Sequence, residues 1–194
     1  MILSLAFVAA CSTPSTVSPI AVPLQYKTMA HPAEFPTLGS CAAVSKIDVD
    51  DAREDKTIGK RFVEGKSAAS AAVTTSSDVP AWLRAAIESA LKRGGANTAS
   101  ASGPVLKVSI DQISTSENVL HRAGYEGRIG FSAEIHPSGS TTPCWKGHTD
   151  GFSENYGYAG SVENYQETLN HAADRAMIKL LSTPEFKKAI CACG

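Results

Sequence analysis

Apolar and polar residues alternate one for one in several separate stretches of the chain. The clearest examples are the stretches from Leu106 to Asp111 and from Tyr125 to Ile135, and residues 46–50 (KIDVD) show the same pattern. Successive side chains of a β-strand point to opposite faces, so this period predicts strands with one buried and one solvated face. Such strands are typical of an antiparallel sheet that is covered on one side only.

A turn-rich segment joins the stretch that ends at Ile135 to a predicted partner strand from Cys144 to Phe152. Residues 137–143 read PSGSTTP, which predicts a hairpin between the strands on either side. If the turn centres on Ser140, the pairing register follows, because the side-chain period of a strand is two residues. The predicted cross-strand pairs are Ile135 with Trp145, Glu134 with Lys146, and His136 with Cys144.

Two further segments carry apolar side chains at the three- and four-residue spacing of an amphipathic helix. The first ends at Gly94 and has Ser77 or Asp78 as its cap. The second can be capped by Ser161 and is interrupted near Pro184. Both helices are therefore expected to bury one stripe against a shared core.

The order of these elements predicts the fold class. A strand, a short second strand at residues 58–63, a helix, three strands and a helix follow one another, while residues 67–77 are expected to be a loop or an edge segment. This β-(β)-α-β-β-β-α order predicts an α+β fold, with two helices packed on one face of a mainly antiparallel sheet. The length of 194 residues suits one domain with a leading segment.

The N-terminus has the pattern of an export signal. Residues 1–10 read MILSLAFVAA, an uncharged apolar stretch within the ~7–15 residues of a secretory signal. The ending Val8-Ala9-Ala10-Cys11 resembles the bacterial lipobox, in which the signal peptidase cuts before the cysteine and acyl chains are added to it. Several acyl chains hold a protein on a membrane stably. The alternative is that this stretch is a buried first strand.

The lipobox resemblance implies an address. Ser12 follows the cysteine, and in Gram-negative lipoproteins this implies sorting to the outer membrane, because aspartate there signals retention at the inner one. Residues 1–10 are then a signal peptide, and residues 11–40 are a lipidated cysteine and a proline-rich tether. Residues 41–194 are a periplasmic α+β domain. Instead of a free tether, residues 12–40 can be an arm that docks Phe35 and Leu38 on the domain.

Besides Cys11, the chain has four cysteines, and an even number in an exported protein favours disulfides. A bond between Cys191 and Cys193 would span one residue and be strained, so the two are expected to take different partners. These partners are Cys41 and Cys144, in either pairing. A metal site formed by Cys144, His136, His148 and the tail cysteines is the less favoured alternative, since no CxxC pair occurs.

The net charge of −1 argues against nucleic acid or an anionic membrane surface as the main partner. The sequence contains no GxSxG, HExxH, P-loop or GxGxxG motif, so no cofactor and no metal are expected. The acidic group at residues 48–55 is predicted to be a solvated turn, because its spacing is not that of a calcium loop. Tyr156, Tyr158 and Tyr165 can form a recognition surface or can seal the end of the sheet.

Several short motifs in order resemble the YajG-like family of bacterial lipoproteins. They are Asp51-Ala52-Arg53 followed by Ile58-Gly59, the helix opening Val79-Pro80-Ala81-Trp82-Leu83, the strand Leu106-Lys107-Val108-Ser109-Ile110, the strand from Tyr125, and a C-terminal helix. The resemblance covers roughly residues 44–190. It implies an outer-membrane-associated lipoprotein and no catalytic residues.

These observations together predict a non-catalytic lipoprotein that is anchored through Cys11 and binds a protein or another envelope component. The expected contact surface is the solvated sheet face with the tyrosine loop; its residues are Glu134, His136, Lys146, Tyr156 and Tyr158. One alternative is an envelope hydrolase or metal-binding enzyme that uses His136, His148 and the acidic turn. Another is a subunit of an envelope assembly that orders only in its complex.

Overall fold

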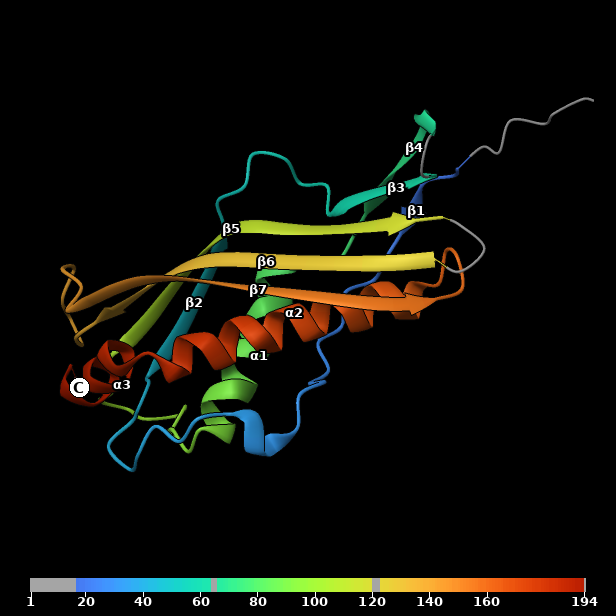
Figure 1. Ribbon diagram of the computed structural model, residues 1–194. Helices are drawn as coiled ribbons and strands as arrows, with labels where there is room; N and C mark the ends of the chain where they lie inside the picture. The colour runs from blue at the N-terminus through green and yellow to red at the C-terminus, as the bar shows by residue number, and fades with distance from the viewer. Residues whose placement is uncertain (1–16, 64–65, 120–122, 194) are drawn as a thin grey trace, which may run out of the picture.

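The computed structural model describes residues 17–63, 66–119 and 123–193 of the chain. Over these residues, helices cover one face of a sheet and leave the other face open (Figure 1). The strands are β1 (Ile20–Ala21), β2 (Lys46–Asp51), β3 (Gly59–Val63), β4 (Lys66–Thr74), β5 (Val105–Asn118), β6 (Ala123–His136) and β7 (Trp145–Gly157). The helices are α1 (Val79–Arg93), α2 (Val162–Ser182), α3 (Pro184–Ala192) and the short 3-10 helix η1 (Pro32–Glu34).

The described strands form one seven-stranded sheet around the long strand β5. β6 pairs antiparallel with β5, and β7 pairs antiparallel with β6. Along the other edge of β5, β2 lies parallel to its first half and β3 parallel to its second half. β4 pairs antiparallel with β3, and β1 pairs parallel with β4. The predicted α+β class is confirmed, and the sheet is mostly antiparallel.

The hairpin of β6 and β7 has the register that the turn predicts. Ile135 pairs with Trp145, and Glu134 pairs with Lys146. The two charged side chains form an ion pair with 2.7 Å between Nζ and Oε1. The turn length therefore predicted the pairing of this hairpin, and the alternation in β6 predicted which of its faces is buried.

The predicted helix caps are present as well. The side chain of Asp78 accepts a hydrogen bond from the backbone N–H of Ala81, and α1 ends at Gly94. The hydroxyl of Ser161 accepts from the backbone N–H of Asn164 at the start of α2. Each cap satisfies a backbone donor that the first helical turn leaves without a partner.

A third helix, α3, corrects the prediction of two helices. Pro184 does not simply interrupt α2; it occupies the first turn of a new helix, where a missing N–H costs nothing. Phe186 and Ile190 are buried and hold α3 against the core, and the Phe186 ring packs edge-to-face on Trp145, with 5.2 Å between ring centroids. No described helix is long and apolar enough to cross a bilayer.

β5 continues through the polar segment that follows Ile110. A register shift between Ile110 and Gln112 inserts a bulge, which reverses the parity of the buried positions. Before the bulge, even-numbered residues are buried; after it, the buried ones are Ile113, Thr115 and Glu117. Every second residue of this polar stretch is therefore buried. The strand continues to Asn118, where β5 pairs with β3.

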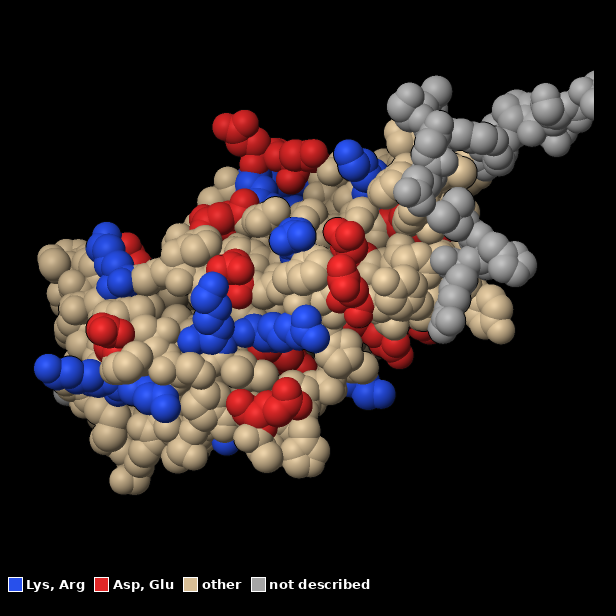
Figure 2. Space-filling model, in the orientation of Figure 1, with Lys and Arg blue, Asp and Glu red and all other residues tan. Residues whose placement is uncertain are grey.

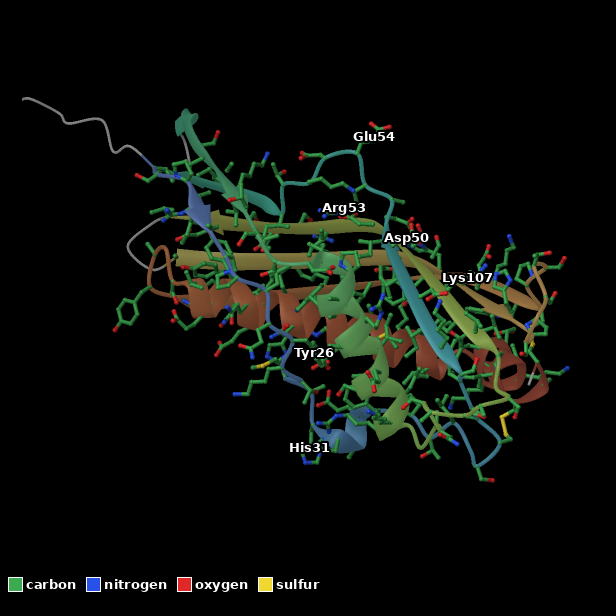
Figure 3. All side chains as sticks on the ribbon, turned by 180° about the vertical axis from the view of Figure 1, so that it is seen from behind. Tyr26, His31, Asp50, Arg53, Glu54 and Lys107 are labelled. Carbon is green, nitrogen blue, oxygen red and sulfur yellow. A yellow bond between two sulfur atoms is a disulfide. The ribbon has the colours of Figure 1, made fainter. Side chains whose placement is uncertain are left out.

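The proline-rich segment lies against the domain over its described part, residues 17–40, as an arm rather than a free tether. Its buried apolar side chains are Val22, Leu24, Phe35 and Leu38. The buried carboxylate of Asp174 on α2 binds the middle of the arm (Figure 3 labels Tyr26 there). Its donors are Tyr26 Oη at 2.6 Å, Met29 N at 2.6 Å, Ala30 N at 2.8 Å and Thr28 Oγ1 at 3.3 Å.

Two disulfides hold the C-terminal tail. Cys41 is bonded to Cys191, and Cys144 is bonded to Cys193, so the two tail cysteines take different partners as expected. The first bond joins the arm side of the domain to α3, and the second joins the start of β7 to the tail. Cys11 and the lipobox lie outside the described residues.

Candidate functional site

The open face of the sheet carries a groove where β3 and β4 meet β5 and β6. Its main part has a volume of about 470 Å³, within the range of small-ligand pockets. Small side chains form the floor, including Ala72, Ser114 and Ser116, while Lys60 and Arg128 supply positive charge at the sides. The groove has room because small residues line it from β4 and β5, the two strands that flank β3.

The groove continues toward the tyrosine end of the sheet. A second hollow of about 290 Å³ shares Ser116 and Glu126 with the first and has Phe62 and Tyr156 among its lining side chains. Glu154 also lines it, and the register places Glu154 directly opposite Glu126 on the neighbouring strand. Like charges in this arrangement destabilise a sheet. The structure thus holds aromatic surface and two carboxylates together on a solvated face.

Elsewhere the open face is a mixture of both charges. Glu134 binds Lys146, and these bonds, with a further one from His136, lower the pKa of the Glu134 carboxyl. The guanidinium of Arg128 lies 4.2 Å from the centroid of the Phe152 ring, a cation–π contact. Figure 2 shows basic and acidic side chains interspersed over the visible surface, with no large patch of one sign. This suits the near-zero net charge.

The predicted contact residues do not form one surface. Glu134 and Lys146 lie at the hairpin end of the sheet, whereas Tyr156 and Tyr158 lie at the opposite end, about 35 Å away along the strands. The groove that the structure shows begins between these ends and reaches Tyr156 alone of the predicted set.

His136 corrects the prediction of a solvated contact residue. It is on the same face as Glu134, and its Nε2 lies 2.8 Å from Glu134 Oε2, yet the residue is only 3% exposed. Nδ1 is buried, and no partner for it occurs among the described atoms. A period of two predicts the face to which a side chain points, but not whether other parts of the chain cover that position.

Glu117 is a site residue that the sequence pattern did not indicate. Its carboxylate is fully buried and accepts hydrogen bonds from four elements of the fold. The donors are Arg61 Nε at 2.5 Å, Tyr165 Oη at 2.5 Å, Gly160 N at 2.6 Å and Tyr125 Oη at 3.2 Å. The polar stretch after Ile110 hid it, because the bulge turns residue 117 inward. The sequence signal that could have indicated it is the alternation at Ile113, Thr115 and Glu117, which continues the buried face of the strand at odd-numbered positions.

The Glu117 cluster fixes the loop between β7 and α2. Tyr125 Oη donates a short hydrogen bond to the carbonyl of Tyr158, and the backbone N–H of Ser161 donates to Tyr125 Oη at 3.1 Å. Burial, with the nearby Glu117 carboxylate, raises the pKa of Tyr125 and more strongly that of Tyr165, so both rings stay neutral as donors. The loop backbone is therefore held while its own tyrosine side chains project outward.

Tyr156 and Tyr158 are strongly exposed, at 63% and 89%. They do not seal the end of the sheet, which was the alternative to a recognition surface. Among the described residues they are the two large hydrophobic side chains left open to solvent. Exposed tyrosines on a held loop are typical of recognition surfaces, because the side chain has little conformational entropy to lose.

The residues of the alternative enzyme hypothesis lie apart. His136 is paired with Glu134, while His148 lies 3.2 Å from Asp111 and four strand positions away from His136 along the sheet. Within the described ranges, no group of three or more His, Cys, Asp or Glu side chains could hold a metal ion.

The acidic turn between β2 and β3 is stabilised by its own basic residues. Nε and Nη2 of Arg53 each donate to the Asp51 carboxylate at 2.8 Å, and this lowers the pKa of Asp51. Arg53 also donates to the carbonyl of Thr57 at 3.0 Å and so braces the loop. Figure 3 shows Glu54 at the outer tip of this loop. The turn is thus a structural loop that bridges β2 and β3.

Comparison with solved structures supports the fold. A Xanthomonas campestris protein of the DUF330 family aligns over 84% of this chain and 92% of its own, with a TM-score of 0.52 and 10% identity. A candidate lipoprotein from Caulobacter crescentus covers 57% of this chain and 81% of its own, with a TM-score of 0.41 and 18% identity. A candidate neuraminyllactose-binding hemagglutinin homolog from Helicobacter pylori covers 88% and 98%, with a TM-score of 0.40 and 9% identity.

No family model and no curated protein matches the chain. The match to the Xanthomonas campestris protein, at a TM-score of 0.52 and 10% identity, shows a shared fold alone. The α+β architecture therefore occurs in the DUF330 family, and the resemblance to the YajG-like family remains a prediction from the sequence motifs.

Proposed function

We propose that the protein is a non-catalytic lipoprotein of the bacterial envelope, anchored through Cys11 at the periplasmic face of the outer membrane. In this proposal, it binds a protein or another envelope component through the groove on the open face of its sheet. The observation that carries the proposal is the groove itself, with its small lining residues, its aromatic side chains, and the carboxylates Glu126 and Glu154, which form no ion pair among the described residues.

Three features support a binding role. The helices leave this face of the sheet open, although a sheet of seven described strands could be covered on both sides. The groove lies on strands rather than on loops, so its shape is preformed, and little entropy is lost when a ligand binds. The Glu126–Glu154 register costs stability in the free protein, which a cationic or hydrogen-bonding partner group would offset.

The anchor is tested by cell fractionation. Wild-type protein is expected in the membrane fraction, and a Cys11→Ala variant is expected to leave it, because the acyl chains supply the membrane affinity. A matched Ser12→Ala variant should stay with the membranes. Membrane association of Cys11→Ala equal to that of the wild type would overturn the anchor.

The groove is tested by site-specific photocrosslinking in cells. A photoreactive residue in place of Lys60, at the side of the groove, should give adducts of defined mass. The same residue in place of Lys92, on α1 across the sheet, is the matched control and should give none. Adding Ser116→Trp fills the floor of the groove and should reduce the Lys60 adduct about tenfold. Equal adducts at both positions, or no effect of Ser116→Trp, would count against the groove.

A further inference from the structure

We infer that the end of the domain that carries Tyr156 and Tyr158 lies against the lipid bilayer, with both tyrosine rings in the headgroup region. This inference rests on the proposed lipid anchor at Cys11. It adds a second membrane contact, made by protein side chains, and it gives the domain a fixed orientation.

The start of the arm lies at the same end of the domain as the tyrosine loop. Arg61 Nη1 donates to the carbonyl of Ser18 at 2.8 Å, and Arg61 Nε binds Glu117 at 2.5 Å. The same Glu117 carboxylate accepts from the backbone N–H of Gly160 at 2.6 Å. One arginine–carboxylate pair therefore ties the start of the arm to the tyrosine loop. Figure 1 shows β1 and the loop between β7 and α2 at the same end of the molecule.

Only a short length of chain connects the proposed anchor to the domain. Seven residue steps separate Cys11 from Ser18. A fully extended chain of that length spans at most about 25 Å. An acylated Cys11 in the bilayer therefore keeps the Ser18 end of the domain near the membrane surface, whichever path the intervening residues take. The hairpin turn at the other end of β6 and β7 lies about 40 Å further out.

The surface at this end exposes side chains that suit a membrane interface. Tyr156 and Tyr158 are the large hydrophobic side chains that the described surface exposes. Tyrosine is enriched at membrane interfaces, where its ring is buried among headgroups while its hydroxyl stays hydrated. The loop carrying Tyr158 is already held through Tyr125 and Glu117, so docking would order no new backbone.

The charges at this end favour a zwitterionic surface. The described acidic side chains there include Glu126, Glu154 and Glu163, while Arg61 is already paired with Glu117. The described residues at this end thus give no excess of positive charge that would attract anionic lipid, and contact depends on the aromatic rings. Docking is expected on vesicles of phosphatidylcholine and phosphatidylethanolamine, with little dependence on salt.

The test uses the full acylated chain in such vesicles, with brominated lipid as a quencher of tryptophan fluorescence. Tyr158→Trp places a reporter in the tyrosine loop at an 89% exposed position, so folding should not change. Ser140→Trp, in the exposed hairpin turn, is the matched control at the other end. The unsubstituted chain gives the background from Trp82 and Trp145.

The added fluorescence of Tyr158→Trp should fall about twofold or more in brominated vesicles, and that of Ser140→Trp should not change. If the acylated chain floats with vesicles but both reporters behave alike, the orientation is wrong and the anchor stands. If the chain does not float with vesicles at all, the anchor itself is wrong, and the orientation falls with it.

Discussion

Two buried carboxylates organise this domain, and they are satisfied in different ways. Glu117 lies at the tyrosine end of the sheet and binds the cation Arg61 together with neutral donors. Asp174 lies on α2 and binds the arm through hydroxyl and backbone N–H groups, with no ion pair among the described residues. Both are almost completely buried.

The difference decides what each carboxylate stabilises. A charge pair inside the protein is costly to break, because removal of one partner leaves the other charge buried. Glu117 therefore makes the tyrosine end a rigid unit. The donors at Asp174 are neutral and belong to an arm that can move into water, so their loss is a local event. Glu117 therefore stabilises the core of the domain, and Asp174 attaches the arm to that core.

The largest effect is expected from Glu117→Gln. The amide cannot neutralise Arg61, whose side chain is largely buried, and the free energy of unfolding should fall by about 3–5 kcal/mol. Urea denaturation measures this change. Glu126→Gln, one strand away and exposed, is the matched control and should change stability by less than about 0.5 kcal/mol. Similar values for the two variants would refute the role of Glu117.

Asp174→Asn should have a smaller and more local effect. Asparagine keeps one acceptor oxygen, which can serve the N–H groups of Met29 and Ala30, but its NH₂ group would then face Tyr26 Oη, whose hydroxyl loses its acceptor. We expect a loss of about 1–3 kcal/mol and faster proteolytic cleavage within residues 17–40. Glu167→Gln, exposed on the same helix, serves as the control. Cleavage of the arm at the wild-type rate would show that Asp174 does not hold it.

The arm should also loosen at alkaline pH. Burial, followed by the bond to Asp174, raises the pKa of Tyr26 to about 12. Because the folded pKa lies above the unfolded value near 10, this contribution is complete below pH 10 and is lost as the pH rises toward 12. Tyr26→Phe should cost about 1 kcal/mol at pH 8 and progressively less above pH 10. Urea titrations from pH 8 to 11.5 measure the difference in free energy of unfolding between the wild type and Tyr26→Phe. A difference that does not change with pH would contradict the role given to the Tyr26 hydroxyl.

The smallest effect is expected at a third carboxylate, Asp51, which is nearer the surface. Its bonds to Arg53 lower its pKa, so its contribution is present above the unfolded value near 4 and is lost as the pH falls through the folded one. Asp51→Asn should cost about 1 kcal/mol or less at pH 7, and this cost should shrink in acid. A cost as large as that of Asp174→Asn would erase the distinction between the two fully buried carboxylates and the partly buried Asp51.

Much of the fold was predictable because it depends on local patterns. Alternation and turn length gave the hairpin register of Glu134 and Lys146, and side-chain chemistry gave the caps at Asp78 and Ser161. The disulfide partners were limited by the geometry of two cysteines separated by one residue. None of these inferences needed knowledge of a distant contact.

The remainder depended on contacts that no short pattern contains. A single bulge after Ile110 reversed the parity of β5 and so hid Glu117. The arm is held largely by backbone N–H groups of Met29 and Ala30, which every residue except proline possesses. The groove arises where β3 meets β5 in parallel, with paired residues such as Gly59 and Thr115 lying 56 positions apart in sequence, and nothing in either strand indicates that pairing.

The most direct test of the account is mass spectrometry of the amino-terminal peptide of protein taken from native membranes. The account predicts a chain that begins at Cys11, with acyl chains on its sulfur and on its new amino group. A chain that retains residues 1–10 and carries an unmodified Cys11 thiol would contradict the anchor, and with it the proposed position of the tyrosine end at the bilayer.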